Sequence, residues 1–484
     1  MSDPLIPSLP SRLLAEQAFS RAAGAPLVNG NAVELLIDAA ANYAAWLAAI
    51  RGASQRVLLE NYIIRDDEVG REFRDALVER AQSGVFVAVV VDWVGCLGQS
   101  GSRFWAPLHA AGGEVRVFNP PQLGQPFGWV SRDHRKLLVV DGVLGFLSGV
   151  CISAKWLGDP TRNVPPWRDT GVALRGPVLV ELEIAFAQSW SEIGAELRPF
   201  AAAPSPAEPV GDVSLRLIAT QPATAGMYRL DQLIAAMARK TLWLTDAYFV
   251  GIAPYVQALV AAARDGVDVR LLVPGSSDIP AVANMSRSGY RSLLQAGVRV
   301  FEWNGSMLHA KTAVADRQWA RVGSSNLNVA SWLSNRELDV AIEDTAFATQ
   351  LATQYEHDLG NATEIVLAPR RRRTGERVRS SEARPPRVRR GGGSSGRAAA
   401  GALRLANSVS AALTHRRVLD DDSVAMPLIA SLVLLLLALV AIMRPAWIGW
   451  PFAALTGWFA LNLAIRGVRM LRKRRRARLD GCEP

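Results

Sequence analysis

The chain repeats itself, and this duplication limits the folds open to it more than any other feature of the sequence. Residues 57–92 and residues 241–274 each hold an apolar strand pattern followed by a tyrosine, a helix-period stretch, and a second β-branched strand. Gly84 closes the first helical stretch and Gly266 the second. Strand, helix and strand in this order predict a βαβ unit with a largely parallel sheet in each half.

A second repeated pattern lies late in each half. It is His-x-Lys-x4-Asp, and its residues are His134, Lys136 and Asp141 in the first half and His309, Lys311 and Asp316 in the second. One copy would be weak, since isolated histidines and lysines are common in strands. Two copies at equivalent places in a duplicated chain are hard to reach by chance.

The spacing of this motif suits phosphate chemistry. Residues two apart on a strand point to the same face, so each histidine and its lysine can converge on one phosphate. Lysine neutralises phosphate oxygens as charge builds, and histidine can attack phosphorus or move protons near neutral pH. The set needs no metal and no other cofactor. Three widely spaced cysteines likewise suggest neither a disulfide framework nor a zinc site.

A carboxylate follows each motif at an equivalent distance. Asp169 stands in a Trp-Arg-Asp triplet and Glu337 in an Asn-Arg-Glu triplet. Each carboxylate can accept the second imidazole N–H of a motif histidine and fix its tautomer. The alternative is an ion pair with the neighbouring Arg168 or Arg336. Two other repeated residues, Tyr62 and Tyr248, are interpreted as packing residues at the ends of the first strands.

These residues resemble the phospholipase D superfamily across about residues 35–368. The paired motifs carry the resemblance, together with the Gly-Ser-rich segment after the second one, residues 323–326. Within the superfamily, the segments ENYII, DAYFV, PGSSD and WRDTGV are most similar to bacterial cardiolipin synthases. The resemblance implies a two-step transfer of a phosphatidyl group through a phosphohistidine.

The resemblance also implies roles for the site residues. His134 is expected to be the nucleophile and His309 the acid and base. Lys136, Lys311, Ser325 and Asn326 are expected to bind phosphate oxygens, with Asp169 and Glu337 orienting the histidines. The motif aspartates, Asp141 and Asp316, complete the candidate catalytic set and are expected to shape the motif loops.

One position departs from the family pattern. Where the second half has Asn326, the first half has Cys151, in the segment Ser148-Gly149-Val150-Cys151. A thiol is a poor donor to phosphate oxygens, so the departure puts a symmetric phosphate clamp in doubt.

Charge is distributed very unevenly. Residues 1–369 hold 31 Lys and Arg against 37 Asp and Glu, whereas residues 370–484 hold 23 against 7. The basic part therefore flanks the most apolar stretch instead of the catalytic region. This pattern favours an anionic membrane surface over nucleic acid as the partner.

Two apolar stretches near the end of the sequence are long enough to cross a bilayer. Residues 424–443 and 446–465 are each uncharged over 20 residues, and at about 1.5 Å per residue they match a hydrocarbon core of roughly 30 Å. Arginines crowd both outer ends, while Arg444 alone lies between. The positive-inside rule then predicts a hairpin with both ends in the cytosol. A re-entrant or interfacial second helix is the alternative.

The expected architecture is α/β: two similar mixed-sheet phospholipase D-like halves around one active site, then a C-terminal transmembrane helical hairpin. The boundaries are an N-terminal segment 1–34, halves at 35–200 and 213–368 joined by a linker 201–212, a flexible Arg-rich linker 369–422, the hairpin 423–466 and a basic tail 467–484. No secretory signal is expected at the amino terminus. The expected location is a bacterial inner membrane, with the catalytic region and both termini facing the cytosol.

The leading functional hypothesis is transfer between two phospholipids, most simply two phosphatidylglycerols giving cardiolipin and glycerol. Hydrolysis to phosphatidic acid is the alternative within the superfamily. A nuclease is disfavoured by the acidic catalytic region, and an inactive scaffold by the two complete His/Lys pairs. The oligomeric state is left open.

Overall fold

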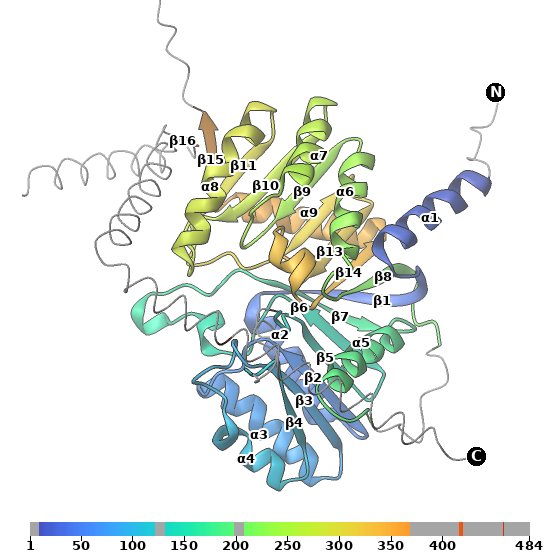
Figure 1. Ribbon diagram of the computed structural model, residues 1–484, viewed down its shortest axis with the longest axis vertical. Helices are drawn as coiled ribbons and strands as arrows, with labels where there is room; N and C mark the ends of the chain where they lie inside the picture. Colours follow the sequence, from blue (N-terminus) through green and yellow to red (C-terminus); the bar gives the residue numbers. More distant parts are fainter. Residues whose placement is uncertain (1–8, 122–130, 198–207, 368–415, 420–457, 459–484) are drawn as a thin grey trace, which may run out of the picture.

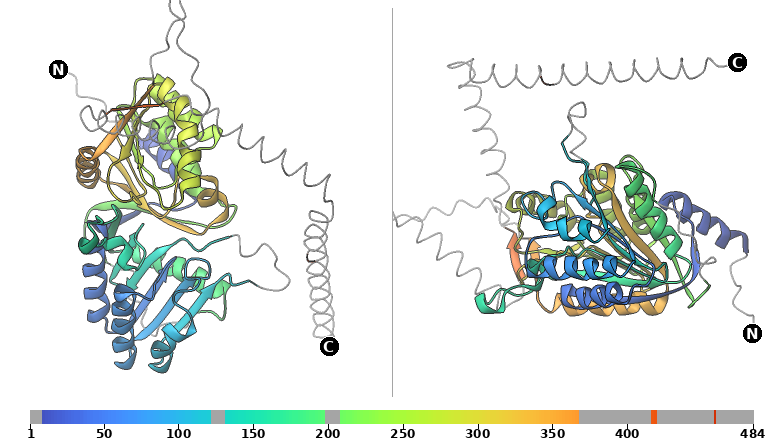
Figure 2. Two further views of the ribbon diagram at one scale, coloured as in Figure 1. Left: turned by 90° about the vertical axis from the view of Figure 1, so that its left-hand side faces the viewer. Right: turned by 90° about the horizontal axis from the view of Figure 1, so that it is seen from below.

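The computed structural model describes residues 9–121, 131–197, 208–367, 416–419 and 458. Within these residues two α/β halves lie one above the other, the first half below and the second above in Figure 1. Figure 2 shows the same stacking from the side and from below.

The two halves share one core succession of strands and helices but differ at their ends. The first half comprises α1 (Leu9–Ala23), β1 (Val28–Ile37), α2 (Asp38–Gly52), β2 (Arg56–Asn61), α3 (Glu68–Gln82), β3 (Phe86–Asp92), α4 (Ser102–Ala110), β4 (Glu114–Phe118), β5 (Lys136–Val140), β6 (Leu144–Ser148), η2 (Ala154–Leu157), η3 (Pro160–Arg162), β7 (Thr170–Arg175) and α5 (Leu179–Glu192). The second half comprises β8 (Val213–Thr220), α6 (Gly226–Met237), β9 (Thr241–Thr245), α7 (Ala253–Arg264), β10 (Asp268–Pro274), α8 (Pro280–Gln295), β11 (Arg299–Trp303), β12 (Thr312–Ala315), β13 (Trp319–Gly323), the π-helical turn η4 (Ala330–Ser334), β14 (Glu337–Glu343), α9 (Thr345–Leu359), β15 (Ala362–Leu367) and β16 (Arg416–Leu419).

The described strands form one continuous sheet of 16 strands in the order β16-β15-β11-β10-β9-β12-β13-β14-β8-β1-β7-β6-β5-β2-β3-β4. Read outward from its centre, both halves have the same succession over seven strands, and β15 and β16 extend the second half. The halves join where β1 pairs antiparallel with β8 on one side and with β7 on the other. This junction places corresponding strands symmetrically about the centre of the molecule.

The sheet is mixed, not largely parallel. The βαβ units supply parallel pairs, β3 with β2 and β4 in the first half, and β10 with β9 and β11 in the second. The strands β5, β6 and β7, and their counterparts β12, β13 and β14, run antiparallel to their neighbours. Short connections such as residues 141–143 explain this, because a hairpin can only join antiparallel strands.

Helices cover both faces of the sheet and bury three apolar cores. One core lies under α2, α3 and α4, and another under α6, α7 and α8. The third contains residues of both halves together with α5 and α9. Gly84 and Gly266 follow α3 and α7 with φ of +84° and +93°, a left-handed conformation that favours glycine at a helix end.

The boundaries of the elements differ in places from those predicted. The first strand begins at Val28, before the expected boundary at residue 35, because this early part of β1 pairs with β8 of the second half. Among the described residues, β16 (Arg416–Leu419) adds to the edge strand β15 in parallel, inside the predicted linker 369–422.

Most of that linker, and the predicted hairpin and basic tail apart from Trp458, lie outside the described residues. No helix in the described part of the chain is long and apolar enough to span a bilayer.

Candidate active site

A cavity of about 540 Å³ opens between the two halves. Both motif histidines line it, His134 just before β5 and His309 just before β12. Its other walls hold aromatic, amide and apolar side chains, among them Tyr62, Cys151, Trp156, Trp167, Tyr248, Asp278, Ile279, Asn326 and Asn328. The duplicated motifs therefore meet in one site, as a shared active site requires.

Each histidine is held by a carboxylate from the opposite half. His134 Nδ1 lies 2.8 Å from Glu337 Oε2, and His309 Nδ1 lies 2.7 Å from Asp169 Oδ2. All four side chains are buried or nearly so. Because Nδ1 is engaged in both rings, Nε2 is the nitrogen that each imidazole has left for chemistry.

Backbone hydrogen bonds explain why the pairs cross between halves. The His134 N–H donates to the carbonyl of Arg336 at 2.9 Å, and the His309 N–H donates to the carbonyl of Arg168 at 2.7 Å. Each motif strand thus enters beside the segment that leads to the other half's carboxylate. The sheet junction at β1 and β8 brings these segments together.

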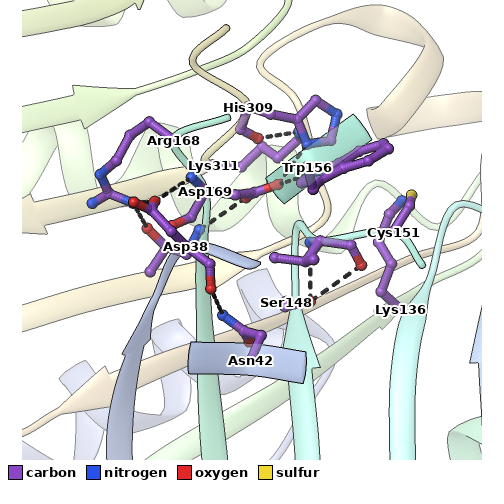
Figure 3. Close-up of polar contacts among 12 residues, drawn as sticks. Asp38, Asn42, Lys136, Ser148, Cys151, Trp156, Arg168, Asp169, His309 and Lys311 are labelled. Carbon is purple, nitrogen blue, oxygen red and sulfur yellow. Dashed lines mark hydrogen bonds and ion pairs between the residues drawn. The ribbon is translucent and has the colours of Figure 1, made fainter. Parts of the chain in front are cut away.

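Besides its histidine, each carboxylate accepts a hydrogen bond from a different kind of residue. The indole Nε1 of Trp156 donates to Asp169 Oδ2 at 3.0 Å, as Figure 3 shows. On the other side, the hydroxyl of Ser324 donates to Glu337 Oε2 at 2.6 Å. Gly149 is the first-half counterpart of Ser324, and a Cβ there would lie 2.2 Å from Asp169 Oδ1. The half-sites are therefore related but not identical.

The motif lysines lie behind the histidines, fully buried. Lys136 Nζ donates to the carbonyl of His134 at 2.5 Å, and Lys311 Nζ donates to the carbonyl of His309 and lies 3.0 Å from its Nδ1. A lysine ammonium has three N–H donors, so each keeps donors for a bound phosphate. The site thus places two ammonium groups next to two imidazoles.

Burial and the lysines set the charge of the site. Burial, then the charge of Lys311, lower the pKa of His309 to about 4, and burial lowers the pKa of His134 as well. Burial also lowers the pKa of Lys311 to about 8. Burial alone would raise the pKa of Asp169, but His309 and Lys311 together lower it to about 2. Near neutral pH the free site holds neutral imidazoles and charged carboxylates.

The motif aspartates do not reach the cavity. Asp141 and Asp316 follow β5 and β12 with φ of +54° and +52°. Asp141 accepts hydrogen bonds from the backbone N–H groups of residues 54–56, and Asp316 from those of residues 239–241. Of the six predicted catalytic residues, the two histidines line the cavity and the two lysines lie buried behind them. The two aspartates instead secure the chain entering β2 and β9.

Of the two uncharged residues predicted to bind phosphate, Ser325 and Asn326, only Asn326 lines the cavity. The Ser325 hydroxyl donates to Asp339 and faces away from the cavity, which corrects its predicted role. Asn326 lines the cavity, and its buried Oδ1 has no partner among the described residues. Cys151, its first-half counterpart, lines the cavity too, and burial raises the pKa of its thiol.

The alternative ion pairs do not form at Asp169 and Glu337. The guanidinium of Arg168 is buried and pairs with Asp358 at 2.9 Å, and Arg336 pairs with Glu192. The carboxylates of Asp169 and Glu337 are thereby left to the histidines.

Sequence reasoning placed the two tyrosines in packing roles, whereas both line the cavity. The ring centroid of Tyr62 lies 4.9 Å from that of His134, and the ring centroid of Tyr248 lies 5.9 Å from that of His309. The tryptophans Trp156 and Trp167 stand at 5.4 and 5.7 Å from His309 and were not predicted. The repetition of a tyrosine after the first strand of each half was the sequence feature that could have predicted Tyr62 and Tyr248 as cavity residues.

Comparison with known proteins identifies the chain. Residues 231–359 match the family described as cardiolipin synthase, PLD-like domain. The cardiolipin synthase of Alkalihalophilus pseudofirmus is 33% identical over 345 residues, covering 70% of this chain and 68% of that protein. The chain belongs to the cardiolipin synthase family. Cardiolipin synthase A of Pseudomonas entomophila is likewise 33% identical over 361 residues, covering 72% of this chain and 73% of the relative.

Membership in the cardiolipin synthase family makes the chain a phosphatidyltransferase and confirms the predicted resemblance to the phospholipase D superfamily. The fold agrees. A crystal structure of phosphatidylserine synthase from Haemophilus influenzae matches with a TM-score of 0.57 at 15% identity, over 72% of this chain and 91% of that one. At this identity the match concerns the fold alone.

Proposed function

We propose that this member of the cardiolipin synthase family joins two phosphatidylglycerol molecules into cardiolipin and releases glycerol. The observation that carries the proposal is the pair of imidazoles on one cavity, each held through Nδ1 by a carboxylate of the other half at 2.7–2.8 Å. One histidine can act as nucleophile while the other moves the proton, so a two-step transfer needs nothing further.

In the first step His134 Nε2 attacks the phosphorus of the donor lipid. The bond from phosphorus to the glycerol oxygen breaks, and that oxygen takes a proton from His309 Nε2. The bound phosphodiester supplies the negative charge that favours protonation of His309, whose pKa is low in the free site. A phosphatidyl group on His134 and a free glycerol result.

In the second step a hydroxyl of the second phosphatidylglycerol attacks the same phosphorus. Its proton passes to His309 Nε2, and the bond from phosphorus to His134 Nε2 breaks with its electron pair returning to nitrogen. Cardiolipin forms and both histidines recover their starting states. Glu337 and Asp169 hold the ring orientations through both steps.

The lysines and the amide supply electrostatic stabilisation. Lys136 and Lys311 lie beside the two histidines and can donate to non-bridging phosphate oxygens, with Asn326 on the cavity wall as a neutral partner. Cys151 offers no comparable donor. The clamp is therefore expected to be stronger on the Asn326 side.

The direct test uses purified full-length protein in detergent with phosphatidylglycerol. Wild type should form cardiolipin with release of glycerol, and His134→Ala and His309→Ala should abolish both, as resolved by mass spectrometry. Phosphatidic acid as the sole product would favour hydrolysis and overturn the proposed transfer. No lipid product with any acceptor would reopen a nuclease or scaffold function.

The proposed location is a bacterial cytoplasmic membrane, entered by the apolar stretches 424–443 and 446–465, with the catalytic part and both termini in the cytosol. The relatives are bacterial proteins, and the charge pattern around these stretches supports this orientation. An Arg-rich segment before the hairpin would add attraction to anionic lipid.

The cysteines offer a test of this topology. Cys96 and Cys151 are buried, whereas Cys482 stands in the C-terminal tail. A membrane-impermeant maleimide should therefore label Cys482 in inverted vesicles but not in intact spheroplasts, with Cys482→Ser as the control. Labelling in intact spheroplasts would contradict the cytosolic tail.

A further inference from the structure

The cavity wall beside His309 carries a carboxylate that the mechanism above does not use. Asp278 lies in the turn between β10 and α8, within the segment PGSSD. Its side chain is 29% exposed and lines the cavity. The hydroxyl of Tyr248 donates to its Oδ1 at 2.7 Å. Asp278 is thus oriented by a residue whose ring contacts His309.

The first half reaches across the cavity to the same carboxylate. Lys155 Nζ lies 3.6 Å from Asp278 Oδ2 and 4.3 Å from the ring centroid of Trp167. Lys155 belongs to η2, next to Trp156, which holds Asp169. A lysine of one half and an aspartate of the other therefore meet at the wall beside a single histidine.

Among the residues that the structure describes, the His134 side has no equivalent carboxylate. The carboxylate that ends the corresponding strand β3 is Asp92, which is fully buried and accepts from the backbone N–H groups of Val94, Gly95 and Asp133. Within the part of the chain that the structure describes, no carboxylate accepts from the Tyr62 hydroxyl, although Tyr62 packs on His134. On the His134 side the cavity is lined instead by Arg132, which pairs with Asp92 at 3.2 Å, so among the described residues the tyrosine-bound carboxylate belongs to the His309 side.

This asymmetry agrees with the different roles proposed for the two histidines, His134 as nucleophile and His309 as acid and base. The alcohol that leaves in the first step and the alcohol that enters in the second both exchange a proton with the acid/base residue, so both lie beside it. In a reaction between two phosphatidylglycerols, both alcohols are glycerol head groups. A carboxylate and a phenol are suited to a vicinal diol, because a carboxylate accepts from two hydroxyls and a phenol both donates and accepts.

The same wall would otherwise suit an ammonium head group. A carboxylate next to tryptophan and tyrosine rings is an arrangement that binds organic cations. Here that position is already taken, because Lys155 places its own ammonium over Trp167 and next to Asp278. A second cation would meet repulsion from Lys155, while a neutral diol would not.

We propose that Asp278, Tyr248 and Lys155 form the head-group subsite of this enzyme, in which Asp278 binds glycerol hydroxyls and Lys155 excludes ammonium head groups. The proposal rests on the proposed function and deepens it. The hydroxyl held by Asp278 attacks phosphorus as the bond to His134 Nε2 breaks, and its proton goes to His309. The choice of head group therefore depends on Asp278 and Lys155, neither of which forms or breaks a bond in the reaction.

The test measures the choice among competing acceptors. Full-length protein receives phosphatidyl-p-nitrophenol, whose leaving group needs no protonation, together with equal concentrations of glycerol, ethanolamine and 1-propanol. Mass spectrometry quantifies the three phosphatidyl alcohols and phosphatidic acid. Asp278→Asn should lower the ratio of glycerol to propanol product about 10-fold, the effect of losing a hydrogen bond to a charged group. Lys155→Gln should raise the ratio of ethanolamine to glycerol product by a similar factor.

Matched surface variants serve as controls. Asp66→Asn changes a carboxylate that pairs with Arg71 in solvent, and Lys240→Gln changes an exposed lysine. Both should keep the wild-type ratios.

Unchanged ratios in Asp278→Asn and Lys155→Gln, with transfer intact, would overturn the subsite but leave the proposed function standing. A parallel fall of all products at constant ratio would also overturn it, as a purely structural role. Phosphatidic acid alone from wild type would overturn the transfer itself.

Discussion

Glu337 and His134 belong to different halves of the chain, yet Glu337 Oε2 lies 2.8 Å from His134 Nδ1. Asp169 and His309 repeat the relationship in the opposite direction at 2.7 Å. Neither half contains a complete histidine and carboxylate pair of its own. The candidate active site therefore depends on correct docking of both halves, and this dependence underlies the predictions below.

Replacing Glu337 with Gln should lower the rate by about 100-fold or more, because the amide no longer stabilises the required imidazole tautomer and charge. The pH profile should move as well. The negative charge of Glu337 raises the pKa of His134, which burial lowers, so its removal lowers that pKa further. Since the nucleophile must be neutral, the acid limb of kcat/KM should shift to lower pH.

The measurement is the pH dependence of phosphatidylglycerol consumption. Glu72→Gln, an exposed carboxylate paired with Arg51, is the matched control and should leave the profile in place. An acid limb that stays fixed or moves to higher pH in Glu337→Gln would argue against this role.

The assignment of the nucleophile can be read from a trapped intermediate. With phosphatidyl-p-nitrophenol as donor, His309→Ala should release a burst of p-nitrophenol and then stall, because no base activates the acceptor. The phosphatidyl mass should be found on the peptide containing His134. His134→Ala should give neither burst nor adduct, and an adduct on His309 in that variant would reverse the assignment.

Replacing Cys151 with Asn should strengthen the phosphate clamp. Cys151 lines the cavity at the place that Asn326 occupies in the other half, and an amide donates to phosphate oxygens far better than a thiol. We expect kcat/KM to rise about 3- to 10-fold, the effect of one added hydrogen bond. Cys151→Ala should show no such gain, and an equal rate in all three proteins would mean that phosphate does not contact this wall.

The same thiol should react slowly with alkylating reagents, because burial raises its pKa and lowers the thiolate fraction. Labelling with N-ethylmaleimide near neutral pH, followed by peptide mass spectrometry, should modify Cys482 well before Cys151. Substrate-protected, rapid labelling of Cys151 would contradict this expectation.

The motif aspartates should affect stability instead of chemistry. Burial alone would raise the pKa of Asp141, but hydrogen bonds from backbone N–H groups hold it below its usual value, and Asp316 behaves alike. Asp141→Ala and Asp316→Ala should each cost about 1–3 kcal/mol of stability. Thermal denaturation should show a lower Tm, while kcat per folded molecule stays near wild type. A large fall in kcat at unchanged Tm would place these residues in the catalytic step.

The sequence alone determined the duplication, the two His-x-Lys pairs and the two carboxylates that serve them. These features are local: a strand alternates its side chains with a period of two, so His134 and Lys136 must share a face wherever the strand lies. The glycines that end α3 and α7 are local in the same sense, because their left-handed conformation depends only on the helix end.

Only the tertiary structure decided which carboxylate serves which histidine. Asp169 and His309 are 140 residues apart, and their contact depends on the antiparallel pairing of β1 with β8, which no local pattern encodes. The turning away of Ser325 toward Asp339 and the inter-half contact of Lys155 with Asp278 likewise follow from packing between distant segments. Spacing along the chain selects the residues that can do the chemistry, whereas sheet pairing selects their partners.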